Sequence, residues 1–279
     1  MKKCMYIFSL ISLLLLASCD SMISEVEIDP GQPKLVVVSY LSPEVDTITL
    51  QLTRSLPLYS IRNYDDWDNE PVPDALVQIS YGQETVKLSY DPIKKRYWTT
   101  DLIVKKGRSY ELFIRTSTGE EVSSSCTIPS KEPPEIEIIS IIRPFPSENF
   151  RILNLRFRDY DGEGDYYRMT VGQLNIYGYH PDEKYIDKIY MQTGEEFVSD
   201  KGYDGEYFTY KTHQFYVWDQ ATLLLYLAIT DVHYYSYHQS IYNFAGDNPF
   251  AEPTPVYSNI EGGLGVFAGF SIVEVELNF

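Results

Sequence analysis

The chain has 279 residues, with 40 Asp and Glu against 23 Lys and Arg, so its net charge at pH 7 is −17. A surface this acidic repels phosphate backbones, and no basic stripe offsets the repulsion, which argues against nucleic acid as a partner. The same charge disfavours electrostatic docking on anionic lipid. Aromatic residues make up 15% of the chain, including 25 tyrosines. This content is typical of β-strands, whose pleated faces accommodate flat side chains.

The N-terminus has the features of a bacterial lipoprotein signal peptide. Lys2 and Lys3 precede an apolar run over residues 6–16, which is too short for an ordinary spanning helix. The run ends in Leu-Ala-Ser-Cys, a lipobox that predicts removal of residues 1–18 and attachment of lipid to Cys19. More than one acyl chain on that residue makes the membrane anchor stable. An ordinary signal peptide or an N-terminal anchor helix is the alternative.

Residues 19–33 lack a helical period and end in turn formers, which is typical of a tether. Short stretches of alternating or β-branched apolar residues follow, with turn residues between them. They occupy residues 35–41, 47–53, 75–81, 86–88, 97–98, 110–114 and 122–128. Short strands at this spacing predict an antiparallel, Ig-like β-sandwich of about seven strands over residues 34–130.

A second β-rich domain is predicted over residues 131–279. Pro133 and Pro134 mark the boundary, because adjacent prolines cannot donate ladder hydrogen bonds and they stiffen the chain. Further strand patterns lie at residues 136–142, 153–157, 167–171, 223–229 and 266–279. The sequence therefore predicts a mainly β protein with two antiparallel β-sandwich-like domains.

One segment of the second domain has a helical period instead. Apolar and aromatic residues from Tyr234 to Ala245 recur at spacings of three and four, which places them on one face of a short helix. Thr230 or Asp231 is expected to cap its N-terminus, and Gly246 to end it.

An acidic loop at residues 159–165 is the candidate metal site. Asp159, Asp161, Glu163 and Asp165 place a carboxylate at every second position, with glycines between them, and such a loop could wrap oxygen ligands around calcium. It lacks the glutamate at the twelfth position of an EF-hand loop. We favour the alternative, a charged hairpin turn, because Asp and Gly commonly form turns without a metal. No cofactor is therefore expected.

The segment at residues 59–70 is the candidate binding loop. It lies between two predicted strands and mixes acidic residues with Tyr59, Tyr64 and Trp67. Long loops that carry aromatic residues on a rigid β scaffold often bind ligands or partners. The alternative is a solvated loop whose aromatic rings fold back on the domain.

The sequence carries no recognisable catalytic motif. There is no G-x-S-x-G elbow, the glycines at residues 262–265 lack the lysine of a phosphate loop, and the four histidines lack zinc-site spacing. Cys126 would be the one unmodified thiol of the mature chain, so no internal disulfide is expected. We therefore expect a protein that is not an enzyme.

Several segments together resemble one family. They are the lipobox and residues 71–77, 107–112, 248–253 and 257–267, the last reading Tyr-Ser-Asn-Ile-Glu-Gly-Gly-Leu-Gly-Val-Phe. Over nearly its whole length the chain resembles the domain of unknown function 4249 family of Bacteroidota outer-membrane lipoproteins. The resemblance implies a β-rich fold and gene neighbourhoods that include TonB-dependent outer-membrane receptors, and it implies no catalytic residues.

These observations lead to three hypotheses. The first is a non-catalytic cell-envelope lipoprotein, lipid-anchored in the outer membrane at the cell surface, that binds a ligand or partner as an accessory of a TonB-dependent receptor. The second is a structural or adhesive surface lipoprotein whose edge strands join neighbouring molecules. The third is a hydrolase of exported glycans or peptides, which would need facing carboxylates or a metal in a cleft.

Overall fold

The computed structural model describes residues 32–56, 70–146, 148–176, 184–218, 221–244 and 255–278. Within these residues the chain is mainly β, with three sheets and the single helix α2. No helix in the described ranges has the length and apolar character that crossing a membrane requires.

The strands form one large sheet and two smaller ones. The large sheet has the order β12 (Lys184–Ile189), β11 (Tyr166–Ile176), β17 (Thr222–Thr230), β18 (Leu264–Asn278), β1 (Leu35–Leu41), β2 (Ile48–Arg54), β6 (Arg96–Thr99) and β5 (Ser89–Asp91), with β14 (Phe197–Ser199) beside β11. The four-stranded sheet has the order β4 (Glu84–Lys87), β3 (Leu76–Tyr81), β7 (Ser109–Arg115) and β8 (Glu121–Thr127). The five-stranded sheet has the order β13 (Met191–Thr193), β15 (Tyr207–Thr212), β10 (Phe150–Arg158) and β16 (Phe215–Tyr216), with β9 (Glu137–Ile142) on β10.

The C-terminal strand β18 joins the two halves of the large sheet. Its first part pairs in parallel with β1, from Leu264 opposite Val36 to Gly269 opposite Leu41. Its second part pairs antiparallel with β17, from Phe270 opposite Thr230 onward. The prediction of purely antiparallel sheets is wrong for β1 and β18, because strands from opposite ends of the chain are not tied by a hairpin that would fix their relative direction.

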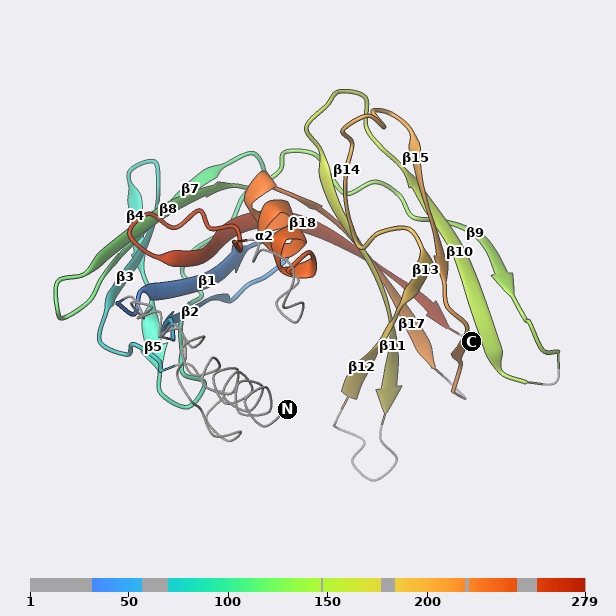
Figure 1. The fold of residues 1–279 in the computed structure, drawn as a ribbon, viewed down its shortest axis with the longest axis horizontal. Helices are drawn as coiled ribbons and strands as arrows, with labels where there is room; N and C mark the ends of the chain where they lie inside the picture. The colour runs from blue at the N-terminus through green and yellow to red at the C-terminus, as the bar shows by residue number, and fades with distance from the viewer. Residues whose placement is uncertain are drawn as a thin grey trace, which may run out of the picture.

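The alternation along β18 determines what covers each face of the large sheet. Phe267 packs into the first core, and Val273 and Val275, which point the same way, pack against the second. Both small sheets therefore cover one face of the large sheet. Val266 and Ala268 point to the other face, where α2 packs. Figure 1 shows the resulting arch, with the large sheet along the inside, one small sheet outside each limb and α2 inside near the apex.

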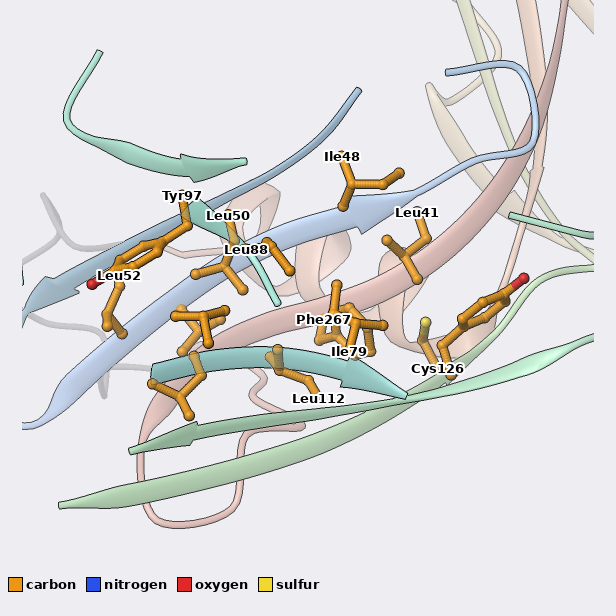
Figure 2. Packing of buried hydrophobic residues seen from close by; sticks show 14 of the residues in the cluster. Leu41, Ile48, Leu50, Leu52, Ile79, Leu88, Tyr97, Leu112, Cys126 and Phe267 are labelled. Atoms are coloured by element: carbon orange, nitrogen blue, oxygen red, sulfur yellow. The ribbon is translucent and has the colours of Figure 1, made fainter. Parts of the chain in front are cut away.

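The first limb consists of β1–β8 and the first part of β18, and its core lies between the large and the four-stranded sheet (Figure 2). Leu50 and Leu52 of β2 project from one side and Ile79 and Leu112 from the other, all at most 2% exposed. The predicted strands of this limb are confirmed, because their apolar residues alternate as a half-buried sheet requires. Cys126 is free and buried in this core, and burial raises the pKa of its thiol.

The second limb consists of β9–β17 and the rest of β18. In its core Phe157 stacks on Tyr210 and packs at a tilt against Tyr167, beside the leucines of β17. The strand patterns predicted for this limb are confirmed, and five further strands, β12–β16, lie between residues 184 and 216. Pro133 and Pro134 connect β8 to β9. The division of the chain into domains at residues 130 and 131 stays a prediction.

The predicted helix is confirmed as α2 (Val232–Tyr242), with Asp231 as the N-cap. The Asp231 carboxylate accepts hydrogen bonds from the backbone N–H of Tyr234 (2.8 Å), Gly269 (3.0 Å) and Thr127 (3.4 Å). One side chain therefore starts the helix and fastens it to β18 and β8. The expected end at Gly246 lies outside the described residues, and the described helix ends at Asn243.

Candidate functional site

Several predicted site residues lie outside the described ranges. They are Cys19, the predicted lipid attachment site, and Tyr59, Tyr64 and Trp67 of the predicted binding loop. The expectations for these four residues stay predictions.

Residues on the two sides of the segment that contains the predicted binding loop meet at the end of β2. Residues 59–69 of the predicted loop lie outside the described ranges. The Arg54 N–H donates to the carbonyl oxygen of Glu70 (3.2 Å), and Thr53 forms an isolated bridge with Pro71.

A groove of about 700 Å³ lies beside that point, on the face of β1 and β2 that points away from the first core. Its floor carries Val38, Tyr40, Thr49 and Gln51, and its wall carries Pro71 and the turn between β5 and β6. The volume falls within the range of small-molecule binding sites, about 300–1,000 Å³. The groove thus combines a ligand-sized volume with the base of the predicted binding loop.

The sequence of β2 explains the polar floor. Ile48, Leu50 and Leu52 are buried in the first core, so the alternating residues Thr49 and Gln51 must point to the groove. Threonine hydroxyl and glutamine amide groups both donate and accept hydrogen bonds. This side of the sheet is therefore suited to a polar ligand.

The wall of the groove is cationic. Lys94 and Lys95 lie in the turn between β5 and β6, and Arg96 follows them as the first residue of β6. The Asp91 carboxylate shapes the turn by accepting from the backbone N–H of Ile93 (2.9 Å) and Lys94 (3.0 Å). In a chain of net charge −17, three adjacent cations create a local field of opposite sign that attracts anionic groups.

Tyr40 connects the groove to an aromatic cluster beneath α2. Its ring centroid lies 5.2 Å from that of Tyr234 and 5.6 Å from that of His238, on which it stacks. Arg168 donates to the Tyr234 hydroxyl (2.7 Å) and pairs with Glu196 (2.8 Å). Burial raises the pKa of Tyr40, so its phenol stays neutral. These contacts fix the Tyr40 end of the groove.

The two histidines of α2 pack beside tyrosines. His233 Nδ1 lies 2.6 Å from the Tyr257 hydroxyl. His238 stacks on Phe197 with ring centroids 5.1 Å apart, and its Nε2 is buried with no hydrogen-bond partner in the described part of the chain. Burial lowers the pKa of His238 to about 4, so the ring is neutral near pH 7.

Two of the four predicted calcium ligands lie together with a third aspartate. Carboxylate oxygens of Asp159, Asp165 and Asp200 lie within 4.8 Å of one another, the one group of three or more potential metal ligands in the described ranges. Asp161 and Glu163 are exposed instead. The fold therefore brings two of the predicted ligands together and leaves the other two in solvent.

Backbone and tyrosine donors already engage this cluster. The Tyr167 hydroxyl (2.6 Å) and the Gly205 N–H (3.0 Å) donate to Asp159. Asp200 accepts from the Gly164 N–H (2.7 Å). These bonds tie the 159–165 turn to the turn after Asp200. The interpretation of the loop as a hairpin turn is wrong, because the strands that it joins, β10 and β11, lie in different sheets and do not pair with each other, so the loop connects the two sheets.

The third carboxylate of the cluster has a cationic partner. Lys131 forms a salt bridge with Asp165 and so places one positive charge beside the cluster. Burial raises the pKa of Asp165, and the lysine opposes that shift. The lysine thus offsets part of the negative charge of the three carboxylates.

Sequence patterns missed two features of these sites. Asp200 is distant in sequence from the acidic loop, and only the pairing of β11 with β14 brings the two together. The cationic wall had a visible signal, three consecutive basic residues in an acidic chain, but its position beside the groove depends on the order of β2, β6 and β5 in the sheet.

The fold and the groove define a mainly β protein with an open polar surface on its large sheet. The chain belongs to the DUF4249 family, a domain of unknown function, whose sequence pattern matches residues 23–276. The family resemblance seen in the sequence is confirmed to this extent. None of the curated proteins compared with the chain matches it.

Proposed function

We propose that the protein is a non-catalytic cell-envelope lipoprotein that binds a ligand or partner in the groove on β1 and β2. It is anchored in the outer membrane of a Bacteroidota cell by lipid on Cys19 and exposed at the cell surface. There it acts as an accessory of a TonB-dependent receptor.

The groove is the observation that carries this proposal. It has a ligand-sized volume of about 700 Å³ and a floor of hydrogen-bonding side chains. Its described lining residues supply hydrogen bonds and positive charge to a ligand. Tyr59, Tyr64 and Trp67 belong to the segment between Thr53 and Pro71, two residues that pair with each other and line the groove, which supports the predicted binding role of the three aromatic residues.

The limbs are further proposed to be sandwich-like domains, the first of them Ig-like. Two sheets facing each other across the first core support this, since β1 and β2 of one contribute to the same core as β3 and β7 of the other. A rigid scaffold of this kind holds loops in fixed positions, as binding surfaces require.

Lipid attachment is tested by metabolic labelling of the chain with a radioactive palmitate in its native host. We expect label in the wild type and in the Cys126→Ala variant, and none in the Cys19→Ala variant, because Cys126 is buried in the first core. Label that persists in Cys19→Ala would overturn the anchor.

Partner binding is tested by purifying the tagged chain from detergent-solubilised outer membranes. We expect an outer-membrane receptor to co-purify with the wild type and to be reduced in a variant with Lys94→Glu and Arg96→Glu, which reverses the charge of the groove wall. Charge reversal at Arg115, which is exposed at the end of β7 and pairs with Glu121, is the matched control. Repeated absence of any receptor would contradict the proposal.

One observation favours the structural or adhesive alternative. Among the described strands β9 pairs with β10 alone, and it exposes Ile139, Ile141 and Ile142 on an edge of the five-stranded sheet. Exposed apolar edge strands pair readily with other chains. Concentration-dependent polymers that an Ile141→Lys substitution abolishes would favour this function.

A further inference from the structure

A second cleft, of about 370 Å³, lies in the second limb, where β11 and β12 meet the segment that contains β16. It is separate from the groove on β1 and β2 and shares no lining residue with it. Aromatic rings and polar side chains line this cleft.

Three aromatic side chains of this cleft are open to solvent. Tyr190 is 67% exposed, Trp218 is 57% exposed and Tyr216 is 41% exposed. The rings of Tyr216 and Trp218 meet edge to face, with centroids 4.9 Å apart. Neighbouring exposed rings of this size usually mark a binding surface, because their apolar area is costly to leave in water.

Buried and charged groups hold these rings in place. Gln173 is only 3% exposed, and its side-chain amide group lies 3.2 Å from Trp218 Nε1 and 3.0 Å from the Tyr216 carbonyl oxygen, within hydrogen-bond distance of both. Lys188 Nζ lies 5.5 Å from the centre of the Tyr190 ring. Binding surfaces that are fixed in advance lose little entropy when a ligand arrives.

Polar side chains surround the rings. Asp187 accepts a hydrogen bond from Asn175 Nδ2 (2.8 Å), which orients its carboxylate, and it lines the cleft with His213 and Gln214. His213 and Gln214 are exposed. The cleft thus presents flat apolar faces together with carboxylate, imidazole and amide groups that exchange hydrogen bonds with hydroxyls.

We propose that this cleft binds a pyranose unit of a glycan. A pyranose has an apolar face of C–H groups, which packs on an aromatic ring, and a rim of hydroxyls, which both donate and accept hydrogen bonds. A cleft of this volume accommodates a short stretch of sugar chain, whereas a stable protein interface buries about 800 Å² on each partner. An apolar peptide segment would leave Asp187 and Gln214 unsatisfied on binding.

The test is calorimetric titration of the full chain, purified in detergent, with maltohexaose, cellohexaose, xylohexaose, chitohexaose and mannohexaose. We expect at least one of these probes to bind at millimolar concentration or below. Trp218→Ala should weaken that binding about tenfold or more, which corresponds to about 1.4 kcal/mol, and Trp218→Phe should weaken it less. The matched control is Trp98→Ala, because the Trp98 indole on β6 is 40% exposed and distant in the fold.

The proposal is overturned if none of the five sugars binds. It is also overturned if Trp98→Ala and Trp218→Ala weaken sugar binding equally. A leucine-rich peptide that binds in a Trp218-dependent manner, without any sugar binding, reassigns the cleft to peptides and overturns it too. If Trp218→Ala unfolds by circular dichroism, the comparison of Trp218→Phe with Trp98→Phe replaces it. Receptor binding through the groove is measured separately, so either proposal can fail alone.

Discussion

The pairing of β1 with β18 is tested most sharply by a Gly265→Ala substitution. Gly265 lies opposite Val37 in the parallel ladder and has a φ of 107°. A Cβ at this position would lie 1.9 Å from the carbonyl oxygen of Val37 and 2.9 Å from its carbonyl carbon. Because both obstacles are backbone atoms, no side-chain rotation relieves the clash, and the two strands must separate locally.

The expected cost follows from two contributions. A non-glycine residue at this φ carries strain of about 1–3 kcal/mol. Local separation of the strands also weakens ladder hydrogen bonds, each worth about 1 kcal/mol. The total is about 3–5 kcal/mol, a large part of the roughly 5–15 kcal/mol that stabilises a typical domain. The loss should appear as a lower urea midpoint at unchanged m-value.

Gly82→Ala is the matched control. Gly82 also has a positive φ, 59°, but no atom lies within 4 Å of its added Cβ. This variant should therefore lose only the conformational cost of about 1–2 kcal/mol. Equal losses in the two variants would refute the close approach of β18 to β1.

Three further predictions concern α2 and the acidic cluster. Asp231→Ala should lower the free energy of unfolding by about 3 kcal/mol, because it removes the helix cap and leaves two more backbone donors unpaired; a loss within experimental error in urea unfolding would contradict this. The pKa of His238 falls from 6.5 in the unfolded chain to about 4 in the fold. Above pH 6.5 the ring is neutral in both states, and the stability of the fold is fully present. As the pH drops from 6.5 towards 4, the unfolded chain binds a proton at His238 that the fold does not, so the free energy of unfolding decreases. His238→Phe should gain stability relative to wild type between about pH 7 and about pH 5, and a constant difference between the two proteins would argue against the buried neutral ring. Calcium should leave the melting temperature of the wild type unchanged, since protein donors already engage the acidic cluster, whereas a rise that Asp200→Asn abolishes would identify a cation site.

Much of the fold could be predicted from alternation along single strands. The apolar residues of β2 and of the second part of β18 repeat with period two because one face of each packs into a core, and that pattern needs no knowledge of partners. The start of α2 was readable for a similar reason, since an aspartate before a helical stripe satisfies the first free N–H groups.

The strands and sites that the sequence did not predict depend on contacts between residues that are far apart in the chain. Strand β12 leaves Tyr185 and Ile186 exposed, so its sequence shows no clear buried face. The parallel pairing of β1 with β18 joins the two ends of the chain, and Asp200 meets Asp159 only through the folded second limb. Sequence spacing cannot report such proximities, because they arise from strand order rather than from local periodicity.

The proposed binding role is tested most directly by site-specific photocrosslinking in intact cells. A photoreactive amino acid at Gln51, which is exposed on the groove floor, should crosslink to an outer-membrane receptor. The same amino acid at Glu111, exposed on β7 of the four-stranded sheet, should give no such product. A receptor crosslink at Gln51 alone is the result we predict, and equal labelling or none at the two positions would contradict the account.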